Sequence, residues 1–463
     1  MIKLKLSQNR RYVKCKKKSV LFVKLEISVE QSTQIMPKQK HVALVIDCSG
    51  SMYGEKIENA KASAMNLVRS LSPNDLISIV TFDSVAEVKL NPTPASDNNI
   101  ENIIRSIEVG ATTALHAGIS TGFQLLQQAS RPNMINALYV FSDGEPNEPI
   151  EHATDDNGDP IDKARRDGDF TQLSRAIRNQ GMTQHVFGIG DDYNGPLLML
   201  LAECGGGKWQ HVADTNQLTT VVNTQIIAMQ NTVILNPQLQ LTLMNGAELA
   251  KVAITKPTLQ EINSEDQQTL SGNTIAIGLK DIVKDESQTI AMRIAVPPIE
   301  DDNVSLLTAA ITEGNNEVAH QTATISCTND MELYNMEVDP SPRVLLSSSE
   351  ATVLLRKGLD GDEEATKLAK TIIKNLDDPE TTKLMNDDAH ATVINTKEIS
   401  GDIKPGMSES EKKRVLHETT IIGEKKEGIE PNLTCPNCNS PIGPTSKVCG
   451  QCGKSINKNE VDN

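Results

Sequence analysis

The stretch His41-Val42-Ala43-Leu44-Val45-Ile46-Asp47-Cys48-Ser49-Gly50-Ser51-Met52 joins an apolar run to a cluster of side-chain oxygens. Val42 to Ile46 contain no polar residue, which is typical of a parallel strand that helices cover on both faces. Asp47, Ser49 and Ser51 follow at alternate positions. Ligands of open α/β sheets bind at the carboxyl ends of strands, and these oxygens suit Mg²⁺, Mn²⁺ or Ca²⁺. The stretch predicts a metal site or, more simply, a polar turn whose serines cap the next helix.

Strand-like and helical patterns alternate over residues 37–229. The elements expected after the first strand are helix 54–71, strands 76–82 and 85–90, helices 99–107 and 115–128, strand 136–141, helix 170–179, strand 184–189, helix 195–202, strand 209–212 and helix 215–229. Such alternation predicts a parallel, doubly wound α/β sheet with right-handed crossovers.

Three polar loops of this region carry a family resemblance. They are Asp47-Cys48-Ser49-Gly50-Ser51, the turn Gly110-Ala111-Thr112-Thr113-Ala114 before a helix, and Ser142-Asp143-Gly144 after a buried strand. In this order the loops resemble the metal-ion-dependent adhesion site of von Willebrand factor A (VWA) domains, and the resemblance covers roughly residues 41–228. It implies a Rossmann-like fold.

The resemblance also implies a set of metal ligands. The five matching residues, which would offer hydroxyl or carboxylate oxygens, are Asp47, Ser49, Ser51, Thr113 and Asp143. Thr113 is preferred to Thr112 because it has the family's spacing to Ala117-Gly118. An acidic side chain of a protein partner would supply the missing oxygen. No His, Lys or Cys stands as an evident base or nucleophile, so we expect no enzymatic activity.

The overall charge narrows the range of partners. The chain has 463 residues, enough for two or three domains, and a formal net charge of −16. This charge argues against nucleic-acid binding and against an anionic membrane face, and favours cations or basic surfaces. The first eighteen residues are the basic exception. No apolar run is long enough for a signal peptide or a membrane span, so we expect a cytoplasmic protein without membrane insertion.

The cysteines fall into two groups. Four scattered ones do not suggest a disulfide framework and suit a reducing compartment; they are Cys15, Cys48, Cys204 and Cys327. The other four form two CxxC pairs within residues 433–456, namely Cys435, Cys438, Cys449 and Cys452. These pairs resemble a zinc ribbon, in which four thiolates fill a tetrahedral Zn²⁺ shell and leave no open position for catalysis.

The remaining segments are expected to form support structure. Period-two strands over 230–340 predict an antiparallel β-sandwich. The strands of residues 1–36 could complete it, which would make the VWA domain an insertion, or could pair with the VWA sheet. Residues 341–385 read as a helical hairpin packed on the sandwich.

Residues 386–432 have few large apolar side chains and many charges, so we expect a disordered linker. Within it, Glu418-Thr419-Thr420 resembles the phosphothreonine motifs that forkhead-associated domains bind, although an inert linker is the simpler interpretation. Phosphate on Thr419 or Thr420 would add charge for a partner's arginines.

Together these features predict a non-enzymatic adaptor or scaffold, in which the VWA domain grips an acidic partner and the zinc ribbon adds a second contact. Two alternatives stay open. One is a VWA subunit of an AAA+ ATPase machine of the chelatase or MoxR type. The other is a phosphosignalling scaffold that works with a kinase, a phosphatase or a forkhead-associated protein.

Overall fold

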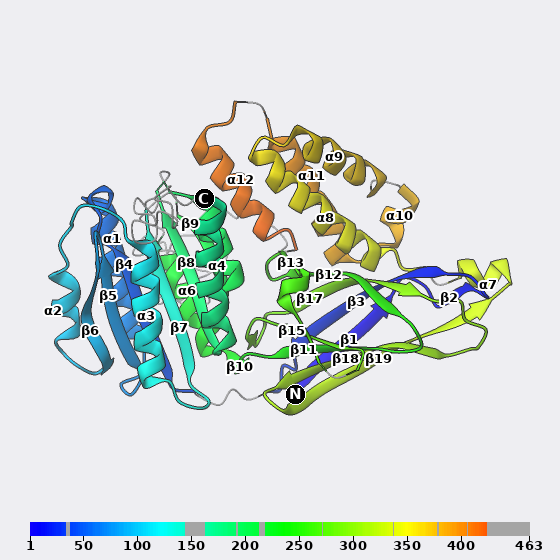
Figure 1. The fold of residues 1–463 in the computed structure, drawn as a ribbon, viewed down its shortest axis with the longest axis horizontal. Coiled ribbons are helices and arrows are strands. Elements are labelled where there is room, and N and C mark those ends of the chain that lie inside the picture. Colours follow the sequence, from blue (N-terminus) through cyan, green and yellow to red (C-terminus); the bar gives the residue numbers. More distant parts are fainter. Residues whose placement is uncertain are drawn as a thin grey trace, which may run out of the picture. The chain divides into compact units, whose positions relative to one another are not determined.

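The architecture combines an α/β domain, a two-sheet β domain and a group of helices (Figure 1). The computed structural model describes residues 1–33, 38–143, 163–190, 193–212, 218–270, 272–336, 338–376, 379–404 and 406–423. The predicted zinc ribbon, with Cys435, Cys438, Cys449 and Cys452, lies outside these residues.

A six-stranded sheet forms the centre of the α/β domain. Its order is β6-β5-β4-β7-β8-β9, with strands β4 (Lys40–Asp47), β5 (Leu76–Phe82), β6 (Ala86–Pro94), β7 (Ile135–Ser142), β8 (Met182–Ile189) and β9 (Gly206–Val212). Neighbouring strands are parallel except β5 and β6. The prediction of a fully parallel sheet is therefore wrong at this edge. The reason is a short hairpin, in which the Asp83 amide donates to the Val85 carbonyl, and a connection this short permits only antiparallel pairing.

Helices cover both faces of this sheet. One face is buried by α1 (Glu55–Ser70), α2 (Ile100–Arg105) and α6 (Leu218–Gln230), and the other by α3 (Leu115–Ala129), α4 (Lys163–Asn179) and α5 (Gly195–Cys204). The apolar side chains of β4 alternate between the two cores and are fully buried. This burial explains the continuous apolar run in the sequence.

The β domain consists of two sheets that share one hydrophobic core. The five-stranded sheet has the order β1 (Ile2–Gln8), β3 (Ser19–Val29), β17 (Gln288–Val296), β12 (Glu248–Lys256) and β13 (Gln260–Glu261). The six-stranded sheet has the order β14 (Gln267–Thr269), β15 (Thr274–Gly278), β11 (Gln238–Leu243), β18 (Val304–Glu313), β19 (Asn316–Thr328) and β2 (Tyr12–Lys14). A separate pair joins β10 (Thr232–Ile234) to β16 (Ile282–Val283), and a short 3₁₀ turn, η4, spans Ser264–Asp266.

The N-terminal strands belong to the β domain and not to the central sheet of the α/β domain. β3 pairs with β17 over nine residues, from Ser19 opposite Val296 to Ile27 opposite Gln288. β2 pairs in parallel with the end of β19. The α/β domain is therefore inserted into the β domain between β3 and β10.

In the part of the chain that the structure describes, six helices follow the strands: α7 (Met331–Asn335), α8 (Ser341–Leu359), α9 (Glu363–Leu376), α10 (Pro379–Leu384), α11 (Asp387–Asp402) and α12 (Glu409–Thr420). α8 packs on the five-stranded sheet, where Val344 and Leu345 join the small side chains of Ala253 and Ala291 in one cluster. The expected hairpin corresponds to α8 and α9. Within the described ranges, no helix has the length and apolar character that crossing a bilayer requires.

The prediction of a disordered linker over 386–432 is wrong for its described part. α11 and α12 occupy most of it, and Ile399, Val415 and Ile422 are buried in a cluster with Leu355 of α8. The apolar residues are sparse, but the helices bring them to one side. Residues 424–432 lie outside the described part of the chain.

A disulfide joins Cys15 to Cys327 across 312 residues of sequence. The expectation that the four scattered cysteines form no disulfide framework is therefore wrong for this pair. Their strands are not neighbours in sequence, so no spacing pattern could indicate the bond, and only the β2–β19 pairing brings the two residues together. Cys48 and Cys204 are free and buried.

Reduction of this disulfide should destabilise the protein, because the bond limits the freedom of the unfolded chain. We expect the double variant Cys15→Ser/Cys327→Ser to lose about 2–5 kcal/mol in its free energy of unfolding. Urea denaturation with and without a thiol reductant measures this loss. Reductant should shift the wild-type transition and leave that of the double variant in place, whereas equal shifts in both proteins would contradict the assignment.

Candidate functional site

The candidate site lies where the central strands β4 and β7 end. The two strands pair in parallel, with Ile46 opposite Phe141, so Asp47 and Asp143 leave the sheet side by side. From β4 the chain first adds β5 and β6 on one side of the sheet and then β7, β8 and β9 on the other side. Open α/β sheets form their ligand-binding crevice at such a switch point. A single 3₁₀ turn, η1 (Gly50–Met52), follows β4 and carries Ser51.

Hydrogen bonds connect four of the five predicted ligands. The Ser49 and Ser51 hydroxyls lie 3.1 Å apart, and Ser51 Oγ donates to Asp143 Oδ1 at 2.8 Å. The Ser49 amide donates to Asp47 Oδ1 at 2.9 Å. Ser142, which sequence reasoning did not assign, donates its hydroxyl to Asp47 Oδ2 at 2.8 Å. The four oxygen-bearing side chains therefore form one continuous network.

The loop that carries Thr113 lies against this network through its backbone. The Gly50 amide donates to the Ala111 carbonyl at 3.2 Å, and the Gly110 amide donates to the Cys48 carbonyl. Thr113 is buried, whereas the neighbouring Thr112 donates its hydroxyl to Ser84 Oγ. No direct hydrogen bond joins Thr113 to the other four residues, and its role as a ligand stays a prediction.

Close backbone approach holds this loop in place. A Cβ atom on Gly110 would lie 1.9 Å from Asp83 Oδ2, and one on Gly118 of α3 would lie 2.6 Å from Phe82 Cδ1. The Ala114 amide also donates to the Asp83 carbonyl. Asp83 is thus a third acid near the site, and the signal for it was its position directly after β5.

Lys56 is the main residue that sequence reasoning missed. Its ammonium lies 2.5 Å from Asp143 Oδ2, and its side chain passes over Gly190, where an added Cβ would come within 3.2 Å of Lys56 Cε. Gly190 has φ +76°, a conformation that glycine tolerates best. The sequence motif therefore did not indicate a lysine that lies at the site. The ion pair makes Lys56 a counter-charge to Asp143.

Burial dominates the electrostatics of the carboxylates. Asp47, Ser49 and Asp143 are almost inaccessible, while Ser51 is exposed. Burial raises the pKa of Asp47 to about 6, and nearby Asp143 raises it further, against the hydrogen bonds from Ser49 and Ser142. Two buried carboxylates with one ammonium leave excess negative charge, which an additional cation would relieve.

The donor set fits a hard cation better than a soft one. Carboxylate and hydroxyl oxygens converge here, and no thiolate or imidazole does, which suits Mg²⁺ or a similar ion. Among the described residues, no group of three or more His, Cys, Asp or Glu side chains could hold a metal. A metal at Asp47 would therefore depend on the serine and threonine oxygens. Cys48 is unsuited as a nucleophile because burial raises its pKa to about 11.

The threonines of the suggested phosphorylation motif are not in a flexible segment. Thr419 and Thr420 end helix α12 and are buried. Arg356 Nε donates to Thr419 Oγ1 at 2.8 Å, and the same arginine pairs with Glu203 of α5 at 3.1 Å. The premise of an accessible, disordered motif is therefore wrong for both residues. Thr419 instead joins α12 to α8 through Arg356, and the Thr420 carbonyl accepts from the Leu259 amide.

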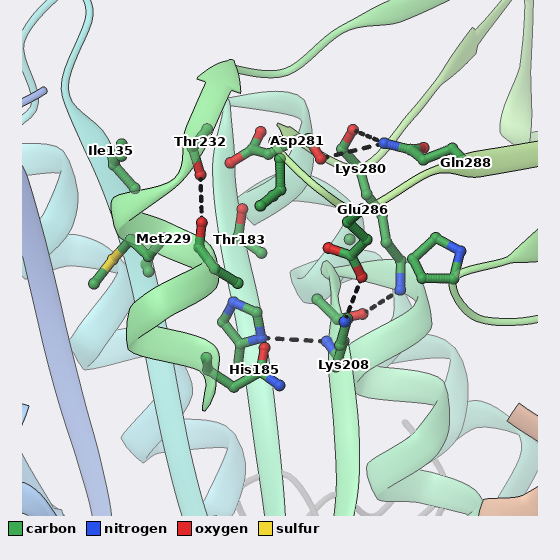
Figure 2. A pocket seen from close by; sticks show the side chains of 17 residues that line it. Ile135, Thr183, His185, Lys208, Met229, Thr232, Lys280, Asp281, Glu286 and Gln288 are labelled. Carbon is green, nitrogen blue, oxygen red and sulfur yellow. Dashed lines mark hydrogen bonds and ion pairs between the residues drawn. The ribbon is translucent and has the colours of Figure 1, made fainter. Parts of the chain in front are cut away.

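A small cavity lies between the α/β domain and the β domain (Figure 2). It measures about 60 Å³, and Lys208 of β9 pairs there with Glu286 at 2.7 Å. Lys280 donates its ammonium hydrogens to the Gly207 carbonyl at 2.7 Å and to Thr258 Oγ1. Since Gly207 belongs to β9 and Thr258 to the β domain, Lys280 links the two domains.

Several titratable groups around this cavity have pKa values far from their ordinary ones. Burial lowers the pKa of Lys280 to about 7, with a smaller contribution from the charge of Lys208. Burial raises the pKa of Asp281 to about 6 and lowers that of His185 to about 3. The cavity has room for no more than a few waters. Of these three groups, Lys280 is the one whose hydrogen bonds join the two domains.

Comparison with known proteins identifies the α/β domain. Residues 41–224 match the family model of the von Willebrand factor type A domain. An uncharacterized protein of Synechocystis is 22% identical over 258 residues, which cover 55% of this chain and 56% of that protein. Calcium-activated chloride channel regulator 1 of Bos taurus is 35% identical over 187 residues, 39% of this chain and 18% of that protein. The chain thus contains a VWA domain but spans about half, or less, of these relatives.

Solved structures share a larger part of the fold. A von Willebrand factor type A protein from Catenulispora acidiphila superposes with a TM-score of 0.69 at 16% identity, covering 92% of this chain and 96% of that chain. The ArnB paralog VWA2 from Sulfolobus acidocaldarius gives a TM-score of 0.58 at 18% identity, with 92% and 99% covered. The likeness therefore extends beyond the VWA domain to most of the described chain.

The link through Lys280 should make stability depend on pH. The pKa of Lys280 is about 7 in the folded chain, whereas the ordinary pKa of a lysine, which applies to the unfolded chain, is 10.5. Between pH 7 and pH 10.5 the unfolded chain therefore binds more protons than the folded chain. Stability should therefore rise as the pH rises from about 7 to 10. Denaturation of wild type and Lys280→Met across this range measures the effect. Lys280→Met should lack this rise, whereas exposed Lys374→Met should keep it; parallel curves for wild type and Lys280→Met would contradict the prediction.

Proposed function

We propose that the VWA domain binds a divalent cation of the Mg²⁺ type and, through it, an acidic side chain of a protein partner. Ser49, Ser51 and Thr113 would offer hydroxyl oxygens, and Asp47 and Asp143 would offer carboxylates directly or through water. The observation that supports this most is the bonded network from Ser49 through Ser51 to Asp143 at the ends of β4 and β7.

The exposure of the site supports a partner that approaches from solvent. Ser51 is exposed while the carboxylates behind it are buried. An ion held against Ser51 would have protein oxygens on one side and open coordination positions on the other. Mg²⁺ usually fills such positions with water or with an oxygen from its ligand, and a carboxylate would add charge complementarity.

We further propose that the protein is an interaction module and not an enzyme. The basic group at the site, Lys56, is engaged with Asp143, and the thiol of Cys48 is buried. Neither group is placed to activate a nucleophile. Structural zinc at Cys435, Cys438, Cys449 and Cys452 stays a sequence-based prediction. The buried state of Thr419 and Thr420 removes the ground for a phosphothreonine scaffold, so we do not propose it.

Loss of the Ser51 hydroxyl should weaken metal binding without unfolding the protein, because Ser51 is exposed. We expect Ser51→Ala to raise the dissociation constant for Mg²⁺ at least tenfold in calorimetric titration of the metal-free full chain. Exposed Ser106→Ala on the end of α2 should bind as wild type does. A glutamate-bearing peptide should then bind only in the presence of Mg²⁺. Wild type that takes up no Mg²⁺, or Ser51→Ala that binds equally well, would overturn the proposal.

Removal of the Lys56 ammonium should strengthen metal binding, since this charge occupies Asp143 Oδ2 and repels an incoming cation. We expect Lys56→Met to lower the dissociation constant for Mg²⁺ by about tenfold in the same titration. Lys61→Met is the matched control, because Lys61 lies on the same helix and pairs with Glu58. Weaker binding by Lys56→Met would show instead that Lys56 positions Asp143 for the metal.

A further inference from the structure

The most basic segment of the chain lies far in sequence from the metal site. Residues 8–19 carry six cations and no acid, in a chain whose net charge is −16. The segment forms the turn between β1 and β2, the strand β2, and the turn that leads to β3. Its cations are Arg10, Arg11, Lys14, Lys16, Lys17 and Lys18. The proposed function of the VWA domain makes no use of this segment.

Two of these cations meet at one aromatic ring. The Arg10 guanidinium carbon lies 4.7 Å from the centre of the Tyr334 ring, and Lys14 Nζ lies 5.1 Å from the same centre. Cation–π attraction holds both groups in place. It also brings two like charges close together, and no described carboxylate forms an ion pair with either of them.

Besides its uncompensated charge, Arg10 has an unsatisfied hydrogen-bond donor. Its Nε atom is buried and has no hydrogen-bond partner among the described residues. A buried donor without an acceptor costs free energy, and a charged one costs more. Arginine presents its donors as a planar fork that matches the oxygens of phosphate or sulfate. Because no described carboxylate compensates the charge of Arg10, an anionic ligand is the partner that its accessible guanidinium favours.

A hollow of about 290 Å³ lies beside this pair. Its walls consist of four cations, three small or apolar side chains and one aromatic ring: Arg10, Lys14, Lys17, Lys18, Val13, Ser19, Val20 and Tyr334. No carboxylate is among them. Lys16, on the same turn, pairs instead with Glu300 at 3.5 Å. The size lies at the lower end of the range for small-ligand sites.

The basic segment is held rigidly. The disulfide from Cys15 to Cys327 ties it to the end of β19, and the Lys16 amide donates to the Ile299 carbonyl at 2.9 Å. Tyr334 stands on α7, which begins three residues after β19 ends. The cations and the ring are thus fixed on one frame before any ligand arrives, which lowers the entropic cost of binding.

We propose that this hollow is a binding site for a phosphate or sulfate group. Arg10 and Lys14 would hold the group, and the positive charges of Lys17 and Lys18 would add to its attraction. A group with two negative charges would neutralise the Arg10–Lys14 pair. The apolar wall of Val13 and Val20 would contact the organic part of an ester. The group could belong to a small soluble molecule or to a lipid headgroup, and the test separates these sources.

The first arm titrates the full, oxidised chain with inorganic pyrophosphate by calorimetry in metal-free buffer, so that the VWA metal site cannot contribute. The second arm measures sedimentation with phosphatidylcholine vesicles that contain phosphatidic acid. We expect wild type to bind in at least one arm, and this binding should weaken as salt is added. Pyrophosphate binding would identify a soluble source, and vesicle binding alone would identify a headgroup.

Two variants keep the test independent of folding. Arg10→Lys retains the charge but loses the fork, and we expect it to weaken binding about tenfold. Lys17→Gln/Lys18→Gln removes two exposed charges and should weaken it several-fold. Lys3→Gln/Lys5→Gln, which removes two exposed charges from β1, is the matched control and should bind as wild type does. Absence of wild-type binding in both arms, or equal losses in the control, would overturn the proposal.

Discussion

The parallel pairing of β4 with β7 is the constraint on which the candidate site depends. It sets two buried carboxylates, Asp47 and Asp143, next to each other at the ends of fully buried strands. Both side chains are held at this edge, Asp47 as the last residue of β4 and Asp143 directly after β7. The chain therefore has to compensate their charge locally, with the hydroxyls of Ser49, Ser51 and Ser142 and with the ammonium of Lys56. A partly compensated anionic cluster that opens to solvent at Ser51 is what a cation site requires.

The insertion of the VWA domain explains features that look unrelated in the sequence. Since β3 pairs with β17, both connections to the VWA domain start from the β domain, and the first is anchored within its sheet. Lys280 adds a buried contact from the β domain to β9. Arg356 adds another from α8 to α5. Such contacts limit the relative motion of VWA sheet and β domain more than two flexible connections could.

The sequence predicted those parts of the fold that local patterns encode. The strands and helices of the VWA domain have continuous apolar runs or helical spacing, so their existence and order were accessible. The antiparallel edge of β6 and the partners of β1 to β3 depend on long-range pairing, which periodicity does not contain. At the site, the motif indicated Asp47, Ser49 and Ser51. It did not indicate Lys56, because the partner of Lys56 is Asp143, which lies far from it in sequence. The helices α11 and α12 were missed because composition was weighed above the spacing of a few apolar residues.

The disulfide changes what the cysteines imply about the protein's environment. The expectation of a reducing, cytoplasmic location rested partly on four unpaired cysteines, and the Cys15–Cys327 bond removes that ground. Disulfides that persist are rare in reducing compartments. In an oxidising one, this bond would fix the basic segment beside Tyr334 and stabilise β2 at the sheet edge. Reduction would remove this covalent tie, while the β2–β19 pairing and the hydrogen bond from the Lys16 amide to the Ile299 carbonyl would still hold the segment. One of the restraints on the basic hollow is therefore redox-sensitive, whereas the carboxylate cluster at β4 and β7 contains no disulfide.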